Sequence, residues 1–138
     1  RLGYLHATEE FVGQAGKLHS HSVSCATNFV QRAGVEALEN ADESVEEMRR
    51  AFADRRDLLV DLFDEHGVDV DVGDGAFYMM IPVADDDQAW CEAAIEEAAV
   101  ACVPGSAFNA PGHARISYAA SEERLREAVD RLVSNDLL

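Results

Sequence analysis

The sequence predicts an α+β fold in which helices cover a small sheet, and the spacing of apolar residues after position 42 is the basis of this prediction. Apolar residues recur at helical spacing in 44–66, 85–99 and 121–132. Short apolar or alternating runs typical of strands lie between these stretches. Because the order is helix, paired strands, helix, strand, strand, helix, we expect one small layered domain.

The first of these stretches has the pattern of a long amphipathic helix. Asp42 or Ser44 can cap its start, and charged residues occupy the face opposite the apolar one. His66 and Gly67 end it, because glycine readily adopts the left-handed conformation that closes many helices. The apolar residues that share a face are Val45, Met48, Phe52, Leu59, Leu62 and Phe63.

Four short runs have the pattern of strands. Valine and aspartate alternate over 68–72, which predicts a half-buried strand, and an Asp-Gly turn follows at 74–75. The apolar run 76–83 predicts a second strand that pairs with the first. Two further short strands are expected at 100–103 and 114–118.

Residues 1–42 have a different pattern. We expect a strand end at 2–7, a helix from Thr8 to Leu18, a polar break at 19–24 and a second helix from 27 to 38. These elements have the character of one strip of a larger α/β body. The abrupt opening, Arg-Leu-Gly-Tyr-Leu, has the pattern of mid-strand, so we expect a fragment or a processed chain.

The charge balance excludes one class of partner. The chain has 27 acidic residues against 11 basic ones, of which only Lys17 is a lysine, and its net charge is −16. A nucleic-acid backbone repels such a surface. The acids are spread over all the helical stretches, which favours a halophilic source with a salt-rich cytoplasm; an acidic mesophilic protein is the alternative. No apolar run approaches the roughly 20 residues of a membrane helix, and no leader is seen, so we expect a cytoplasmic protein.

Cysteine and histidine suggest no metal site. The three cysteines, Cys25, Cys91 and Cys102, are odd in number and form no CxxC pair, so we expect free, mostly buried thiols in a reducing cytosol. The five histidines lack ligand-like spacing, and His19 and His21 would suit a metal only on a strand.

Four segments carry a family resemblance. They are Arg1-Leu-Gly-Tyr4, Gly75-Ala-Phe-Tyr78, Val103-Pro-Gly-Ser-Ala-Phe108 and Arg115-Ile-Ser-Tyr-Ala119, and a serine-rich stretch at 20–25 lies between the first two. Each alone is a weak signal. In this order, over nearly the whole chain, they resemble the class I and II aminotransferases, pyridoxal-phosphate (PLP) enzymes of fold type I.

The resemblance implies a domain organisation. Residues 1–42 would be a remnant of the large PLP-binding domain with the interdomain helix. Residues 43–138 would be the small C-terminal domain. The whole protein would be a homodimer that moves an amino group between an amino acid, with aspartate as a candidate, and a 2-oxo acid in a ping-pong reaction. The residues that select the amino acid are expected largely outside this chain.

Arg115 is the strongest candidate for a site residue. A guanidinium in an apolar strand is costly unless paired, and its planar fork matches a carboxylate with two parallel hydrogen bonds. The residues alone leave a buried ion pair with a local acid equally open. The resemblance implies that Arg115 holds the α-carboxylate of the substrate.

Other candidates rest on the resemblance. It implies that Arg1 contacts the cofactor phosphate, although a terminal arginine can simply be solvated. It implies that Gly75 and Phe77 line the substrate entrance, although core packing is the plainer role for Phe77 and Tyr78. It implies that Pro104, Gly105 and Phe108 shape a loop beside the active site. The plainer role for them is a turn anchored by one aromatic side chain.

The lysine that would form the Schiff base with PLP is not in this chain. The resemblance places it just upstream of Arg1, whereas Lys17 lies on the other side of that arginine in an expected surface helix. We therefore expect no catalytic residue here and no activity of the chain alone. Two alternatives stay open: an aminotransferase-like ligand-sensing domain of a regulator, and a stand-alone carboxylate-binding module.

Overall fold

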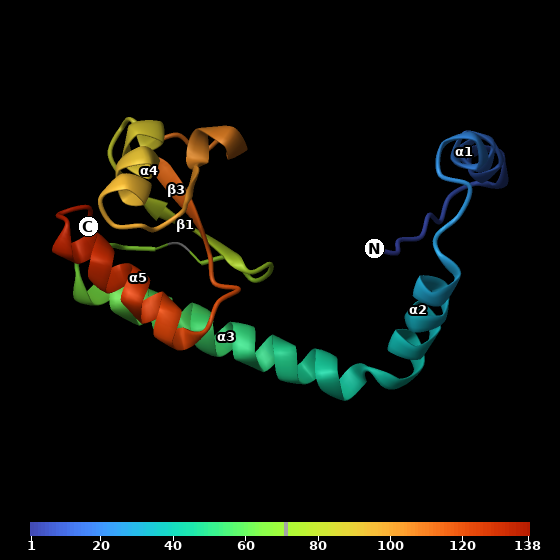
Figure 1. Cartoon of the computed structure of the whole chain (residues 1–138), viewed down its shortest axis with the longest axis horizontal. Coiled ribbons are helices and arrows are strands. Elements are labelled where there is room, and N and C mark those ends of the chain that lie inside the picture. Colours follow the sequence, from blue (N-terminus) through green and yellow to red (C-terminus); the bar gives the residue numbers. More distant parts are fainter. Residues whose placement is uncertain (71) are drawn as a thin grey trace. The chain divides into compact units, whose positions relative to one another are not determined.

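The computed structural model describes residues 1–70 and 72–138, and they form two compact units, Arg1–Glu47 and Met48–Leu138. The boundary lies inside a long helix, α3 (Asp42–Glu65). Figure 1 shows the elements of both units.

The second unit is a small α+β layer, as the sequence predicts. Its three strands form an antiparallel sheet in the order β1-β3-β2, so β3 lies in the centre. The elements after α3 are β1 (Tyr78–Pro82), α4 (Asp87–Glu96), β2 (Val103–Pro104), the short 3₁₀ helix η1 (Gly105–Phe108), β3 (His113–Ser117) and α5 (Glu122–Ser134).

One apolar core holds this unit together. Leu59 and Phe63 of α3 are at most 1% exposed, and they pack with side chains from the sheet, α4 and α5. Trp90 of α4 also donates its indole N–H to the carbonyl oxygen of Leu137 at 3.0 Å, which ties α4 to the end of the chain. The other buried apolar residues are Met79, Ile81, Cys91, Ala94, Ala98, Ala114, Tyr118, Leu125, Val129 and Leu132.

The pleat of the sheet divides core residues from site residues. Side chains alternate between the two faces of a strand, and Met79 and Ile81 of β1 are buried with Ala114 of β3. Their neighbours along the strands therefore point to the opposite face. On that face Arg115 lies directly across from Met80 in β1 and from Val103 in β2.

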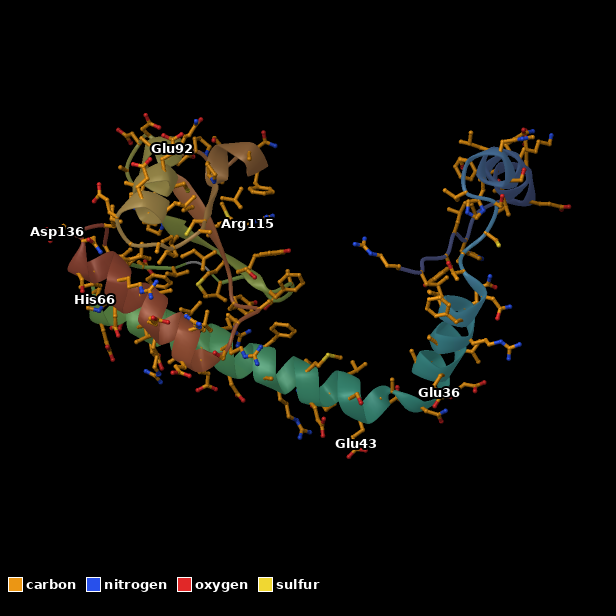
Figure 2. The ribbon with its side chains drawn as sticks, in the orientation of Figure 1. Glu36, Glu43, His66, Glu92, Arg115 and Asp136 are labelled. Carbon is orange, nitrogen blue, oxygen red and sulfur yellow. The ribbon has the colours of Figure 1, made fainter. Side chains whose placement is uncertain are left out.

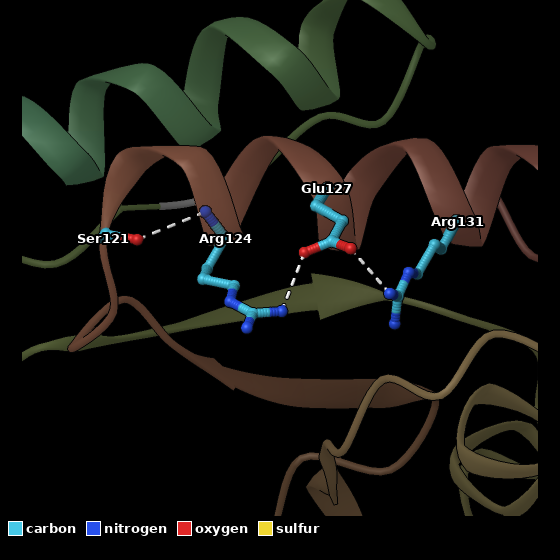
Figure 3. A network of polar contacts seen from close by, with 4 residues as sticks. All are labelled: Ser121, Arg124, Glu127 and Arg131. Carbon is cyan, nitrogen blue, oxygen red and sulfur yellow. Dashed lines mark hydrogen bonds and ion pairs between the residues drawn. The ribbon is translucent and has the colours of Figure 1, made fainter.

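The final helix shows how local sequence fixes an element. The Ser121 hydroxyl accepts the Arg124 backbone N–H at 3.4 Å, which caps the start of α5. On its solvent side Glu127 pairs with Arg124 at 3.0 Å and with Arg131 at 2.6 Å (Figure 3). Because these partners are substantially exposed, the buried stripe of leucine and valine on the other side contributes more to stability.

Several expectations for the second unit are confirmed and others are wrong. Gly67 has a φ of +75° and closes α3, as predicted. The strand expected at 68–72 is not formed by residues 68–70 and 72. Asp71 lies outside the residues that the structure describes. The strand expected at 100–103 begins only at Val103. The first apolar positions of α3, Val45 and Met48, are more than half exposed, so the core starts one turn later, at Phe52.

The first unit contains α1 (Glu9–Ser22) and α2 (Asn28–Asn40). Thr8 caps α1 as predicted, but the helix continues into the polar break expected at 19–24 and ends at Ser22. Residues 2–7 form no strand, because a strand needs a partner for its backbone hydrogen bonds.

This unit buries no side chain within residues 1–47, all of which the structure describes. Large apolar side chains are exposed along both helices instead: Phe11, Val12, Leu18, Phe29, Val35 and Leu38. The apolar faces that would normally stabilise such helices are therefore uncovered.

We predict that hydrogen exchange will distinguish the two units. Amides of α3 from Met48 to Phe63 should exchange much more slowly than those of α1, because only the former lie over a buried core. Exchange of the monomeric chain, followed by mass spectrometry of peptides, measures this difference. Equal protection of residues 1–25 and the α3 segment would contradict it.

Candidate functional site

Arg115 lies half-buried on the open face of the sheet, between two aromatic rings. Its Cζ is 3.9 Å from the centroid of the Phe108 ring and 4.4 Å from that of Tyr78. Tyr78 lies diagonally across from it on β1, and Phe108 reaches it from η1. Figure 2 shows the Arg115 side chain beside η1. Both distances are within the range of cation–π attraction.

No acid of residues 1–70 and 72–138 forms an ion pair with Arg115, and no hydrogen bond from its guanidinium is present within that part of the chain. The described residues therefore do not form the buried ion pair with Arg115 that the sequence left open. The N–H groups of the guanidinium stay available to a ligand. A planar fork of this kind binds a carboxylate through two parallel hydrogen bonds.

The loop that carries Phe108 is fixed by a buried carboxylate. Within the described chain Asp87 is the one buried charged side chain, 5% exposed, in the first turn of α4. It accepts the backbone N–H of Ser106 at 2.9 Å and the Ser106 hydroxyl at 3.0 Å. These two hydrogen bonds, one of them from the backbone of η1, offset the free-energy cost of burying the Asp87 charge.

Gly105 is required by close packing at the same turn. A Cβ added there would overlap the carbonyl oxygen of Ala110 and lie 2.7 Å from that of His113. Asn109 then closes η1 in the left-handed conformation, with a φ of 58°. The Pro-Gly turn expected from the sequence is therefore a tightly packed bend that sets the position of Phe108.

Phe77 contacts one of these rings, whereas Gly75 lines a separate hollow that includes neither Arg115 nor either ring. The Phe77 ring is 4.3 Å from that of Tyr78 and stacks on Phe52 of α3 at 5.8 Å. Phe77 and Tyr78 are 39% and 37% exposed, so the core role expected for them is wrong. Gly75 borders a hollow of about 290 Å³, which Phe52 and Tyr118 also line.

Arg1 belongs to the other unit and is exposed. It borders a hollow of about 350 Å³ that His19 and Thr27 also line. A guanidinium beside a hydroxyl suits the phosphate end of a cofactor such as PLP. Lys17 is exposed on α1 and does not line this hollow, so the donors present fit the phosphate and offer no amine for the rest of the cofactor.

The Cys91 and Cys102 thiols are held in their protonated form by their surroundings. Burial, and then the Asp87 carboxylate, raise the pKa of Cys91, and burial together with Cys91 raises the pKa of Cys102 to about 12. Cys25 is exposed, contrary to expectation, and all three are free. Among the described residues no three His, Cys, Asp or Glu side chains could share a metal ion. In the same part of the chain no helix is long and apolar enough to cross a membrane.

Comparison with known proteins identifies the family. Residues 1–132 match the model of the family described as aminotransferase class I and II. The chain belongs to this family, as its four motifs indicated.

Individual relatives agree on the family and differ in their substrates. The chain is 42% identical to the aspartate aminotransferase of Thermotoga maritima, over 96% of this chain and 34% of the relative. It also resembles the structure of an aromatic aminotransferase from Pyrococcus horikoshii (TM-score 0.86, 34% identity, 96% and 38% covered). The aspartate aminotransferase from Thermus thermophilus with maleate is similar too (TM-score 0.86, 36% identity, 91% and 34% covered). The chain thus spans about a third of the length of these relatives.

Sequence reasoning identified Arg115 and expected Phe108 beside the site, but it missed Tyr78 and Asp87. Tyr78 was expected in the core, and Asp87 was not singled out within the helical stretch 85–99. Side chains alternate between the two faces of a sheet along β1 and β3, and this alternation could have placed Tyr78 on the same face as Arg115. Nothing local indicated that Asp87 reaches Ser106, because that contact joins elements 19 residues apart.

We predict that Asp87→Ala destabilises the chain by about 1–3 kcal/mol, because the Ser106 N–H loses its partner in a partly buried place. Urea unfolding followed by circular dichroism measures the change. Asp85→Ala is the matched control, since it removes the same charge from an exposed position two residues away. Equal effects of the two substitutions would show that the contact with η1 is unimportant.

We also predict that this chain, mixed with PLP and reduced with borohydride, carries no stoichiometric label on a specific lysine. Lys17 is exposed on α1 and lines no part of the hollow beside Arg1. Mass spectrometry of the digested product locates any label. A single adduct at Lys17 that Lys17→Ala abolishes would overturn this prediction.

Proposed function

We propose that this chain is part of a PLP-dependent aminotransferase, in which Arg115 binds the α-carboxylate of the substrate. The observation that supports this most directly is a half-buried guanidinium that has no acidic partner among the described residues and two aromatic rings against it. Family membership supports the reaction class.

One arginine suits both halves of a transamination. The amino acid and the 2-oxo acid each carry a carboxylate on the carbon next to the reacting bond. Arg115 would bind that group in either substrate with two parallel hydrogen bonds and so orient the α-carbon. Phe77 and Gly75 would border the entrance.

The cofactor would be held mainly by residues beyond this chain. Arg1 would contribute to binding the phosphate, and PLP when bound supplies an electron sink for bonds at the α-carbon. We assign residues 1–42 to the large PLP-binding domain with the interdomain helix, and 43–138 to the small C-terminal domain. On this assignment the chain alone is inactive, because the lysine that attaches the cofactor lies elsewhere.

The choice of amino acid depends on more than Arg115. Relatives named for aspartate and for aromatic amino acids resemble the chain at 42% and 34% identity. Because the α-carboxylate is common to all amino acids, Arg115 cannot discriminate between their side chains. We take aspartate as the first candidate substrate.

Assembly and setting are further parts of the proposal. The apolar side chains exposed on α1 and α2 are consistent with burial against the rest of the protein and a second subunit of a homodimer. The net charge of −16 supports a cytoplasmic protein of a halophilic source.

We predict that Arg115→Lys in the complete enzyme weakens amino-acid binding at least roughly tenfold, which corresponds to about 1.4 kcal/mol. Lysine keeps the charge but loses the fork. Steady-state kinetics with aspartate would show the change, and PLP binding should survive because its phosphate is held elsewhere.

The control is a decarboxylated amine, which never used the arginine and should be far less affected by Arg115→Lys. If amino acid and amine lose activity equally, or if only the cofactor is lost, Arg115 is structural. The assignment of the carboxylate site would then be wrong.

A further inference from the structure

The rings against Arg115 come from two separate elements. Tyr78 lies on β1 and Phe108 on η1, and their centroids are 4.4 Å and 3.9 Å from the Arg115 Cζ. We call these two residues the ring pair. An arginine side chain loses about 2 kcal/mol of rotamer freedom when it is fixed in one place. Contacts that fix it before a ligand arrives reduce that cost of binding.

A ring holds an arginine without competing for its ligand. An acidic side chain would also fix the guanidinium, but it would occupy the N–H donors and neutralise the charge. A ring attracts the cation through its quadrupole and leaves the charge in place. In a chain with 27 acidic residues, rings rather than carboxylates contact Arg115 within the described residues.

Each ring is itself anchored. Tyr78 contacts Phe77, whose ring stacks on Phe52, and Phe52 packs against the core. On the other side, Ser106 is fixed by Asp87 in the turn that carries Phe108. The two supports come from different helices, α3 for Tyr78 and α4 for Phe108.

We propose that Phe108 and Tyr78 are positioning residues that hold the Arg115 guanidinium ready for a substrate carboxylate. This inference rests on the proposed role of Arg115. The aromatic ring is the required feature, and the Tyr78 hydroxyl is not.

The test compares ring-removing and ring-keeping variants in the complete enzyme. Phe108→Leu and Tyr78→Leu keep an apolar side chain, whereas Phe108→Tyr and Tyr78→Phe keep the ring. We expect Phe108→Leu to raise KM for aspartate roughly 3–10-fold, or about 0.7–1.4 kcal/mol, with kcat within about twofold. Both ring-keeping variants should stay within about twofold of wild type.

The decarboxylated amine separates positioning from general damage. Its kcat/KM should change less than about twofold in Phe108→Leu, because the amine does not use Arg115. Equal losses for amine and amino acid, or equal behaviour of Phe108→Leu and Phe108→Tyr, would overturn the inference. If the wild-type enzyme shows no transamination at all, the proposed function fails instead.

A second measurement on this chain does not depend on activity. Nitrogen-15 NMR of arginine side chains should show the Arg115 Nε–H signal displaced by ring currents. The displacement should shrink in Phe108→Leu and persist in Phe108→Tyr, while backbone spectra confirm that both variants fold. An unshifted Arg115 signal in the wild-type chain would overturn the inference whatever the enzyme does.

Discussion

The antiparallel pairing of β3 with both neighbouring strands is the constraint on which the second unit depends. β3 lies between β1 and β2, so each of its residues has a partner on one or both sides. The pleat then sends Ala114 into the core and Arg115 to the open face. A slip of one residue would exchange these two positions. It would bury an unpaired guanidinium, so the core and the site enforce the same register.

The site is built outward from that register by aromatic contacts. Arg115 contacts Tyr78 because the two are diagonal neighbours across β1 and β3, a spacing that long side chains can bridge. Phe108 completes the surroundings only because η1 bends at Gly105, where no side chain fits. The buried Asp87 carboxylate fixes that bend from α4. The position of one guanidinium is thus determined by the packing of the whole unit.

The sequence predicted those parts of this arrangement that local pattern controls. Helical spacing placed α3 and α5, and Gly67 marked a helix end, whereas Ser44, expected as a cap, lies inside α3. The runs 2–7 and 68–72 had strand character without a strand partner, and the described residues of both are irregular. A strand depends on its neighbours for its hydrogen bonds, so pattern alone cannot establish one. Phe108 was expected beside the active site, whereas the contact of Tyr78 with Arg115 was missed because it joins two strands distant in sequence.

Aromatic contacts also suit the acidity of the chain. Exposed ion pairs weaken as salt rises, since the screening length falls to about 3 Å at 1 M. The attraction between a cation and a ring at 3.9 Å acts across a contact that solvent ions cannot enter, and apolar burial strengthens in many salts. In the salt-rich cytoplasm that we propose, an arginine held by acids would lose part of its support, whereas one held by rings would keep it.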